Sequence, residues 1–569
     1  MTMALMELLV RRAAPLRALP LVVLVTLLAA CGGGTTSGAE AASASVASAG
    51  QVVAAPVLKV SFYAASRFAE QASFGPTPAL VAELQAKGFA GWIDAQFALP
   101  ASQIDLAPFL VNPTPEPADN QNYQRAFTDL AIAANDQLRV RLAWTLWQII
   151  AINETRGDRL GMLAFQNLML ASALGRYEEL LHSVTRNAYV GENTSLRHNR
   201  IADETCLDCR PNTHYARALM GHFTIGSVLL EGDGSVKRVN GRPVAAYTPR
   251  DVSELARALT GWQFDPEAID SPRLPRDWGN WRKPMVPNTF PGVRDYEAKR
   301  ILGRDFAAYQ SHDEQLHAVL ELLTGHDNAA PFMAVRLIRH LVKSDPSPAY
   351  VQRVAAVFRN NGAGVRGDMK ALVKAVLLDA EARAGDDPTR SGARDGRLRD
   401  PYLHLTGQLR AMGCQRVLAN RDGWPSIGAS QHPNRAATHA GWTSPTDRAP
   451  LSGLPSPELR LLSGEEVRAR SIRAGAWGET DPATNRTEPF QYRRAGCDID
   501  NIVALYSRDA DAYLDWLSRR FLRGAMSPRL RAVLEQSITE HAWNNRLQPE
   551  PPMFLMATLL VSPDYGVIR

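Results

Sequence analysis

The sequence has little excess of either charge and no apolar run long enough to cross a bilayer. Its 569 residues carry a net charge of +5, which falls to +3 when the first 30 residues, with three arginines and one glutamate, are removed. A balance this close to neutral gives no electrostatic reason to bind nucleic acid. The 40 glycines and 37 prolines are near average frequency, so we expect disorder only in local stretches.

Familiar catalytic motifs are absent as well. The chain has no G-x-S-x-G elbow, no P-loop and no Rossmann glycine pattern. His312 and His317 are five residues apart, or about 140° around a helix, so both cannot face one metal ion. We interpret this pair as part of a solvated helix face. The sequence reveals no reaction, predicts no cofactor, and leaves open whether the protein is an enzyme.

An export signal occupies the N-terminus. Three arginines precede the apolar run "LVVLVTLLAA", which is shorter than the roughly 20 residues of a membrane span and is typical of a secretory signal. The run ends in "LAAC", Leu28 to Cys31. This motif resembles the lipobox of bacterial lipoproteins, in which the cysteine is lipidated and becomes the new N-terminus. The alternative is an ordinary cleaved signal with an incidental cysteine.

The residues after Cys31 are rich in glycine, serine and alanine, a composition typical of a flexible tether. Gly32 follows the cysteine where an aspartate would favour retention at the inner membrane. By resemblance to sorted lipoproteins, we therefore expect a lipid anchor in the outer membrane. The sequence leaves open whether the body faces the periplasm or the cell surface.

Four cysteines remain after the lipid-attachment residue, an even number suited to an oxidising compartment. They are Cys206, Cys209, Cys414 and Cys497. Of the three possible pairings, we favour Cys206–Cys209 with Cys414–Cys497. The alternative is a metal held by "CLDC" together with His198 and His214. Structural zinc usually has two tight ligand pairs, so we predict no metal.

Helical periodicity dominates the rest of the chain. The fold class that we predict is mainly α, a large multi-helix body with a small β-hairpin at Asn240-Gly241 and a long irregular insertion. Thr248 and Ser311 are expected to begin helices, each with an acidic residue three positions on. The predicted divisions are a lipoprotein signal at 1–31, a tether at 32–56, a helical domain at 57–386, a loop-rich segment at 387–489 and C-terminal helices at 490–569.

An ordered set of segments resembles one bacterial family. The set is "ASRFAEQASFGPT", "DQLRVRLAWTLWQI", "GRYEELLHSVT", "YARALMGHFTIG", "YTPRDVSELARALTGW", "AKRILGR", "SPELRLL" and the closing "LLVSPDY". Together they are similar to the family called domain of unknown function 1800. The resemblance implies a large, exported, mostly helical protein of unestablished activity. It also implies a possible partner, because such proteins are often encoded beside the exported domain of unknown function 1501 family.

The segment "CRPNTHYARALMGHFTIG", Cys209 to Gly226, departs from the family form. Residues that are acidic in the family correspond to Thr213 and Ala218, and its Gln or Glu corresponds to Gly221. On one continuous helix, a single stripe is expected to hold His214, Ala218, Gly221 and Ile225, with Arg217 beside it.

Two interpretations of this stripe stay open. In the first, Ala218 and Gly221 let another helix approach, and Arg217 is salt-bridged to a carboxylate. In the second, the small residues open a pocket in which His214 and Arg217 act, with His222 as a weaker member.

The segment "ARALTGW" supplies a second candidate. Arg257 needs a carboxylate partner if it is buried, and Asp251 and Glu254 are local candidates. The simpler interpretation is a structural ion pair covered by Trp262. A further departure precedes Lys299, where Arg294-Asp295 stand in place of the family's His followed by an acid.

Two classes of function remain. The first is a non-enzymatic scaffold or binding component of the cell envelope, anchored by its lipid. The second is a hydrolase or transferase acting on an envelope or extracellular substrate. Its expected catalytic residues are Arg217, His214, Arg257 and Asp251.

Overall fold

The computed structural model describes most of the chain beyond the tether. The described residues are 59–110, 117–152, 159–202, 206–267, 280–390, 395–417, 431, 461–462, 464, 466–468, 470, 479–480, 487–488, 492–493, 495–540 and 551–569. Cys31, the signal and the tether lie outside them, as does most of the segment 387–489. The predicted divisions of the chain stay predictions.

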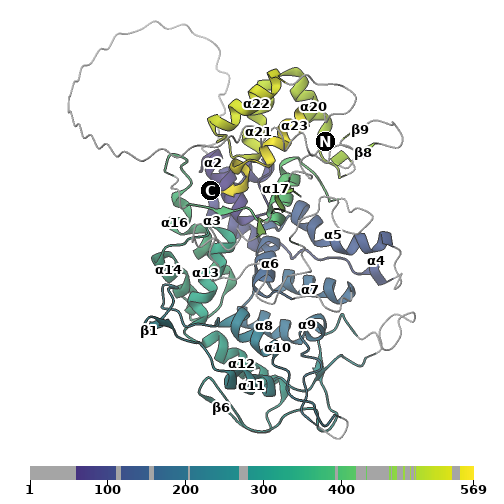
Figure 1. Cartoon of the computed structure of the whole chain (residues 1–569), viewed down its shortest axis with the longest axis vertical. Coiled ribbons are helices and arrows are strands. Elements are labelled where there is room, and N and C mark those ends of the chain that lie inside the picture. The colour runs from purple at the N-terminus through teal and green to yellow at the C-terminus, as the bar shows by residue number, and fades with distance from the viewer. Residues whose placement is uncertain are drawn as a thin grey trace, which may run out of the picture. The chain divides into compact units, whose positions relative to one another are not determined.

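Helices form most of the described structure (Figure 1), which confirms the mainly α prediction. The first half contains α2 (Phe62–Ala72), α3 (Pro78–Ala98), α4 (Ala107–Leu110), α5 (Pro117–Ala133), α6 (Gln137–Ile149), α7 (Arg159–Ser172), α8 (Tyr177–Arg186), α9 (Ala188–Asn193), α10 (His214–Ala218), the π-helix η1 (Leu219–Thr224) and α11 (Pro249–Ala258). The second half contains α12 (His312–Gly325), α13 (Ala329–Leu341), α14 (Pro348–Arg359), α15 (Met369–Leu378), α16 (Ala380–Ala384), α17 (Pro401–Ala411), α20 (Ile499–Arg508), α21 (Ala510–Phe521), α22 (Pro528–Glu540), α23 (Pro551–Leu560) and α24 (Pro563–Gly566).

Strands in the described residues occur only as short antiparallel pairs. The pairs are β1 (Arg238–Val239) with β2 (Arg242–Pro243), β3 (Trp262–Gln263) with β4 (Val286–Pro287), β5 (Lys299–Ile301) with β6 (Arg304–Phe306), β7 (Arg397–Leu398) with β10 (Val567–Ile568), and β8 (Glu479–Thr480) with β9 (Thr487–Glu488). Asn240 and Gly241 connect β1 to β2 with φ of 50° and 75°, as a type I′ turn requires. The predicted hairpin is confirmed.

Local signals set many helix ends. Thr248 and Ser311 each accept the backbone N–H three residues on, and Asp251 and Glu314 complete the two capping boxes. Inside α3, Gly88 has a φ of 72° and bends the helix, a conformation that glycine adopts without steric cost.

The described residues build two hydrophobic cores. The larger core surrounds α6, in which every residue is buried. The smaller core is built by α17 and the C-terminal helices, and α17 lies beside α21 (Figure 1). Helix α17 belongs to both cores, since Tyr402 packs in the larger one and Leu409 in the smaller one. Within the described residues, we find no helix with the length and apolar character of a membrane span.

Candidate functional site

The segment from His214 to Gly226 is not one continuous α-helix. After α10 the chain widens into η1, where Ile225 N–H and Gly226 N–H both donate to Met220 O. Gly226 ends the turn with a φ of 75°, and a Cβ there would lie 2.8 Å from the Phe332 ring. π-helical turns are rare, and they often mark functional or constrained sites.

The widened turn interrupts the predicted stripe after Ala218, where α10 ends. A π-helix has more residues per turn than an α-helix, so positions on either side of Leu219 lose their α-helical register. Ala218, Gly221 and Ile225 are buried, whereas His214 and Arg217 face the surface. A Cβ on Gly221 would lie 2.6 Å from the Tyr247 hydroxyl. The glycine therefore makes room for a tyrosine.

The first interpretation gave Arg217 a carboxylate partner, and none pairs with it among the described residues. Its side chain donates from Nε to Thr213 Oγ1 at 3.3 Å. Burial of Tyr247 raises its pKa, and the positive charge of Arg217 opposes that shift. His214 begins α10, and desolvation lowers its pKa.

Asp251 has a structural role at the start of α11. Its Oδ2 accepts the N–H of Thr248 at 2.8 Å, and its Oδ1 accepts the N–H of Leu302 at 2.8 Å. Leu302 has a φ of 48° in the tight turn between β5 and β6, a region that few residues other than glycine adopt. Asp251 therefore ties the helix start to a strained turn.

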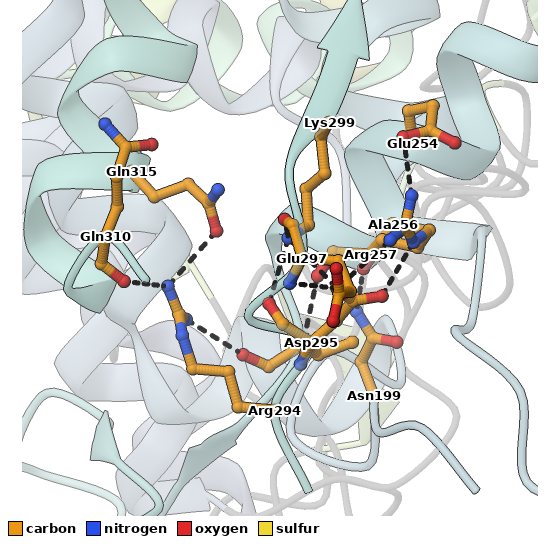
Figure 2. A network of polar contacts seen from close by, with 11 residues as sticks. Asn199, Glu254, Ala256, Arg257, Arg294, Asp295, Glu297, Lys299, Gln310 and Gln315 are labelled. Atoms are coloured by element: carbon orange, nitrogen blue, oxygen red, sulfur yellow. Dashed lines mark hydrogen bonds and ion pairs between the residues drawn. The ribbon is translucent and has the colours of Figure 1, made fainter. Parts of the chain in front are cut away.

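Arg257 is the centre of a compact ion cluster, which we define as Glu254, Arg257, Asp295 and Lys299 (Figure 2). Arg257 Nε donates to Asp295 Oδ2 at 2.6 Å, its Nη2 donates to Asp295 Oδ1 at 3.2 Å, and its Nη1 donates to Glu254 Oε2 at 2.8 Å. Lys299 Nζ lies 3.1 Å from Asp295 Oδ1. The Asp295 carboxylate thus pairs with two cations, and the Arg257 guanidinium binds it through two hydrogen bonds.

The ion cluster favours the charged forms of Asp295 and Arg257. Burial alone would raise the pKa of Asp295, but hydrogen bonds from Arg257 and Lys299 outweigh it and lower the pKa. The hydrogen bond to Asp295 raises the pKa of Arg257. Desolvation lowers the pKa of Lys299, while Asp295 opposes that shift.

Arg294 points away from the ion cluster into the protein (Figure 2). Its Nη2 donates to Gln310 O and to Gln315 Oε1, both at 3.1 Å. Nearby, His312 Nε2 lies 2.9 Å from Gly261 O, and burial lowers the pKa of His312 to about 4. The interpretation of this histidine as part of a solvated face is wrong, because the ring is buried against Trp262.

Asn199 links the two segments that the resemblance singled out. Its Nδ2 donates to Ala256 O in α11 at 2.7 Å, and its Oδ1 accepts the N–H of Asn212 at 2.7 Å. The sequence missed this asparagine, and it missed Asp295 as the partner of Arg257. The departure before Lys299 was the one available signal for Asp295.

The expected catalytic residues thus have different described partners. Arg217 contacts Thr213, Asp251 holds a helix start and a turn, and Arg257 belongs to the ion cluster. The simpler interpretation gave Arg257 a structural ion pair, and the ion pair with Glu254 agrees with it. Trp262, the first residue of β3, is buried.

The cysteines form the two disulfides that the sequence favoured. Cys206 is bonded to Cys209, and Cys414 is bonded to Cys497 in the smaller core. His198 lies 3.5 Å from Glu192 Oε2. Among the described residues, no group of three or more His, Cys, Asp or Glu side chains is placed to hold a metal ion.

The fold and the site define a large, mainly helical protein in which segments distant in the sequence are joined by ion pairs and hydrogen bonds. The chain belongs to the family described as Protein of unknown function (DUF1800), whose model matches residues 67–567. No curated protein and no solved structure matches it.

Proposed function

We propose that the protein is a lipid-anchored, non-catalytic binding component of the bacterial cell envelope. The observation that carries this proposal is that the charged groups of the ion cluster already pair with one another. Two cations and two carboxylates neutralise one another, with Arg257 bound to both acids. A general acid or base needs a pKa near the working pH. The pKa of Asp295 is lowered and that of Arg257 is raised, so this cluster is suited to holding a surface segment in place.

The segment that it holds carries two exposed tyrosines, Tyr296 and Tyr309, which we call the tyrosine platform. Tyr296 follows Asp295 directly, and Tyr309 N–H donates to Tyr296 O at 2.8 Å. The rings are stacked with their centroids 6.2 Å apart and an angle of 18° between their planes. Tyr309 is 82% exposed and has a φ of 62°. A strained, exposed aromatic residue supports a binding role.

The ligand that this platform fits best is an envelope glycan. Stacked rings present a flat apolar face with polar edges, which matches the C–H faces and hydroxyls of sugar rings. Arg294 lies under the platform, with its guanidinium carbon 5.4 Å from the Tyr296 ring centroid. The exposed side chains of Glu297 and Arg300 add hydrogen-bonding groups along the same segment. The domain of unknown function 1501 family, implied by the resemblance, is the competing kind of partner.

Binding to isolated envelope glycans tests the platform. We expect Tyr309→Ala to weaken binding about two- to tenfold, because one aromatic contact contributes roughly 0.5–1.5 kcal/mol. Tyr309→Phe keeps the ring and should bind like the parent protein. Leu207→Ala is the matched control, since Leu207 is 81% exposed in the Cys206–Cys209 loop. If glycans fail to bind, and Tyr309→Ala instead abolishes capture of an exported protein of the 1501 family, the ligand class is wrong.

Membrane fractionation tests the anchor separately. We expect Cys31→Ser to release the protein from the membrane fraction, because the residue that would carry the lipid is lost. Gly32→Asp keeps the cysteine and should move the protein from the outer to the inner membrane. A Cys31→Ser protein that stays in the outer membrane would contradict the lipid anchor.

A further inference from the structure

A hollow of about 260 Å³ lies where α3, α5 and α17 meet. Its lining comes from both halves of α3, the end of α5 with the following loop, the first residue of α6, and Arg410 of α17. A water molecule occupies about 30 Å³ of liquid. The hollow therefore has room for a small organic molecule. It is built by elements other than those that carry the ion cluster and the tyrosine platform.

Arg410 brings an uncompensated charge to this hollow. The side chain is 4% exposed, and its Nε donates to Gly75 O at 2.8 Å while its Nη1 donates to Ile132 O and Ala131 O. Among the described residues, no acceptor contacts Nη2 and no carboxylate pairs with the guanidinium. Burial lowers the pKa of Arg410 to about 10. A buried cation normally has an anionic partner.

Two other buried arginines show what is missing at Arg410. Arg399 Nη2 donates to Glu70 Oε1 at 2.8 Å, and Arg523 Nη1 donates to Glu70 Oε2 at 2.7 Å. The carbonyl groups at the end of α5 give Arg410 only the partial negative charge of a helix C-terminus. An anion in the hollow would supply the rest.

A second donor lines the same hollow at the start of α3. Thr77 Oγ1 accepts the N–H of Leu80, and Pro78 has no N–H. Ala79 N–H has no acceptor among the described residues, as is usual for the first turn of a helix. Helix N-termini favour anions. Ala79 and Arg410 therefore present donors and positive charge to one space.

The other residues that line the hollow indicate what the rest of the ligand is like. Leu80, Trp92 and Ile132 are buried and apolar. Glu83 also lines the hollow, but its Oε1 lies 2.7 Å from Lys87 Nζ and its Oε2 accepts Trp92 Nε1 at 3.2 Å. Its charge is thus partly neutralised. The polar residues Gln96, Asn135 and Gln137 also line the hollow. The hollow therefore suits one anionic group on a compact, partly apolar body.

We propose that this hollow binds a small organic monocarboxylate. The carboxylate accepts from Arg410 Nη2 and from Ala79 N–H, and the apolar body lies against Trp92 and Ile132. This function is independent of the tyrosine platform, and it requires no lipid anchor.

Calorimetric titration of the purified full chain with benzoate tests the proposal, with benzamide and inorganic phosphate as comparison probes. We expect benzoate to bind saturably and benzamide to bind at least about tenfold more weakly, because a charge-assisted hydrogen bond is worth about 1.5–3 kcal/mol. Arg410→Met should weaken benzoate binding about ten- to a hundredfold. Arg336→Met is the matched control, since Arg336 is also a buried arginine that donates to a carbonyl, that of His222.

Two surface variants keep the test decisive if Arg410→Met fails to fold. Ala79→Pro removes only the N–H donor, in a first helical turn that tolerates proline, and should weaken benzoate binding severalfold. Glu83→Gln removes the nearby negative charge and should tighten it severalfold. Equal binding of benzoate and benzamide, insensitivity to both surface variants, binding of phosphate alone, or no saturable binding of any probe would each overturn the proposal.

Discussion

Glu70 and Asp295 each bind two cations, but the two carboxylates hold different parts of the structure together. Glu70 joins Arg399 and Arg523, and all three side chains are at most 4% exposed. Asp295 joins Arg257 and Lys299 near the surface, with Arg257 27% exposed. Glu70 connects residues 329 and 453 positions away, whereas the partners of Asp295 are 38 and 4 positions away. The Glu70 ion pairs therefore join distant parts of the chain, whereas the Asp295 ion pairs hold one local segment.

The largest expected effect breaks the Glu70 ion pairs. Glu70→Ala leaves two buried guanidinium groups without their carboxylate, which should lower the free energy of unfolding by about 3–5 kcal/mol. Asp295→Ala should cost less, because Arg257 keeps Glu254 and reaches solvent. The buried Lys299 ammonium loses its carboxylate, but it still donates to the backbone oxygens of residues 295 and 297. Urea denaturation monitored by circular dichroism measures both. Equal losses, or a larger loss for Asp295→Ala, would contradict the division between ion pairs that join distant parts of the chain and ion pairs that hold one local segment.

A smaller effect is expected in acid at His312, which lies beside Gly261 and Trp262. Burial lowers the pKa of His312 to about 4 from the 6.5 of an exposed histidine, so His312 is neutral in the folded protein at pH 5. The unfolded chain takes up that proton first. The free energy of unfolding is therefore unaffected by His312 above pH 6.5 and falls as the pH drops toward 4, by at most about 3 kcal/mol.

Amide hydrogen exchange can localise this acid effect. Asn288 N–H donates to Gly261 O beside His312, and Arg399 N–H donates to Gly566 O near Glu70. Between pH 6.5 and 4, protection should fall more at Asn288 than at Arg399. Burial also lowers the pKa of His182 and of His340, so His312→Gln is needed to isolate the contribution of His312. If His312→Gln leaves the pH dependence at Asn288 unchanged, the assignment is wrong.

The comparison also explains what the sequence could predict. Helix periodicity, the two capping boxes and the Asn240-Gly241 hairpin depend on neighbours within a few positions, and all were predicted. The segment "ASRFAEQASFGPT" was recognised as a family match, but the role of Glu70 was not, because its partners lie hundreds of residues away. The pairing of Arg257 with Asp295 was also missed, because 38 positions separate the two residues.

The π-helix escaped prediction for another reason. Helix periodicity assumes about 100° per residue, and nothing in "LMGHFT" signals a wider turn before its packing is known. Gly221 is required there by Tyr247, and Gly226 by Phe332. Both contacts come from elements outside the segment, so a helical wheel could not place the residues after Ala218, such as Ile225, correctly relative to His214.

The smallest expected effect concerns Arg217, the residue that drew most attention in the sequence. Its side chain is exposed, and its described hydrogen bond to Thr213 is long at 3.3 Å. Arg217→Ala should therefore change the free energy of unfolding by less than about 0.5 kcal/mol, and it should leave glycan binding to the tyrosine platform unchanged. Urea denaturation and the glycan-binding assay measure the two quantities, with Arg257→Ala as the comparison that should reduce both. A clear loss of ligand binding in Arg217→Ala would add α10 to the binding surface, because an exposed arginine whose described side-chain contact is one long hydrogen bond to Thr213 would then act by contacting the ligand.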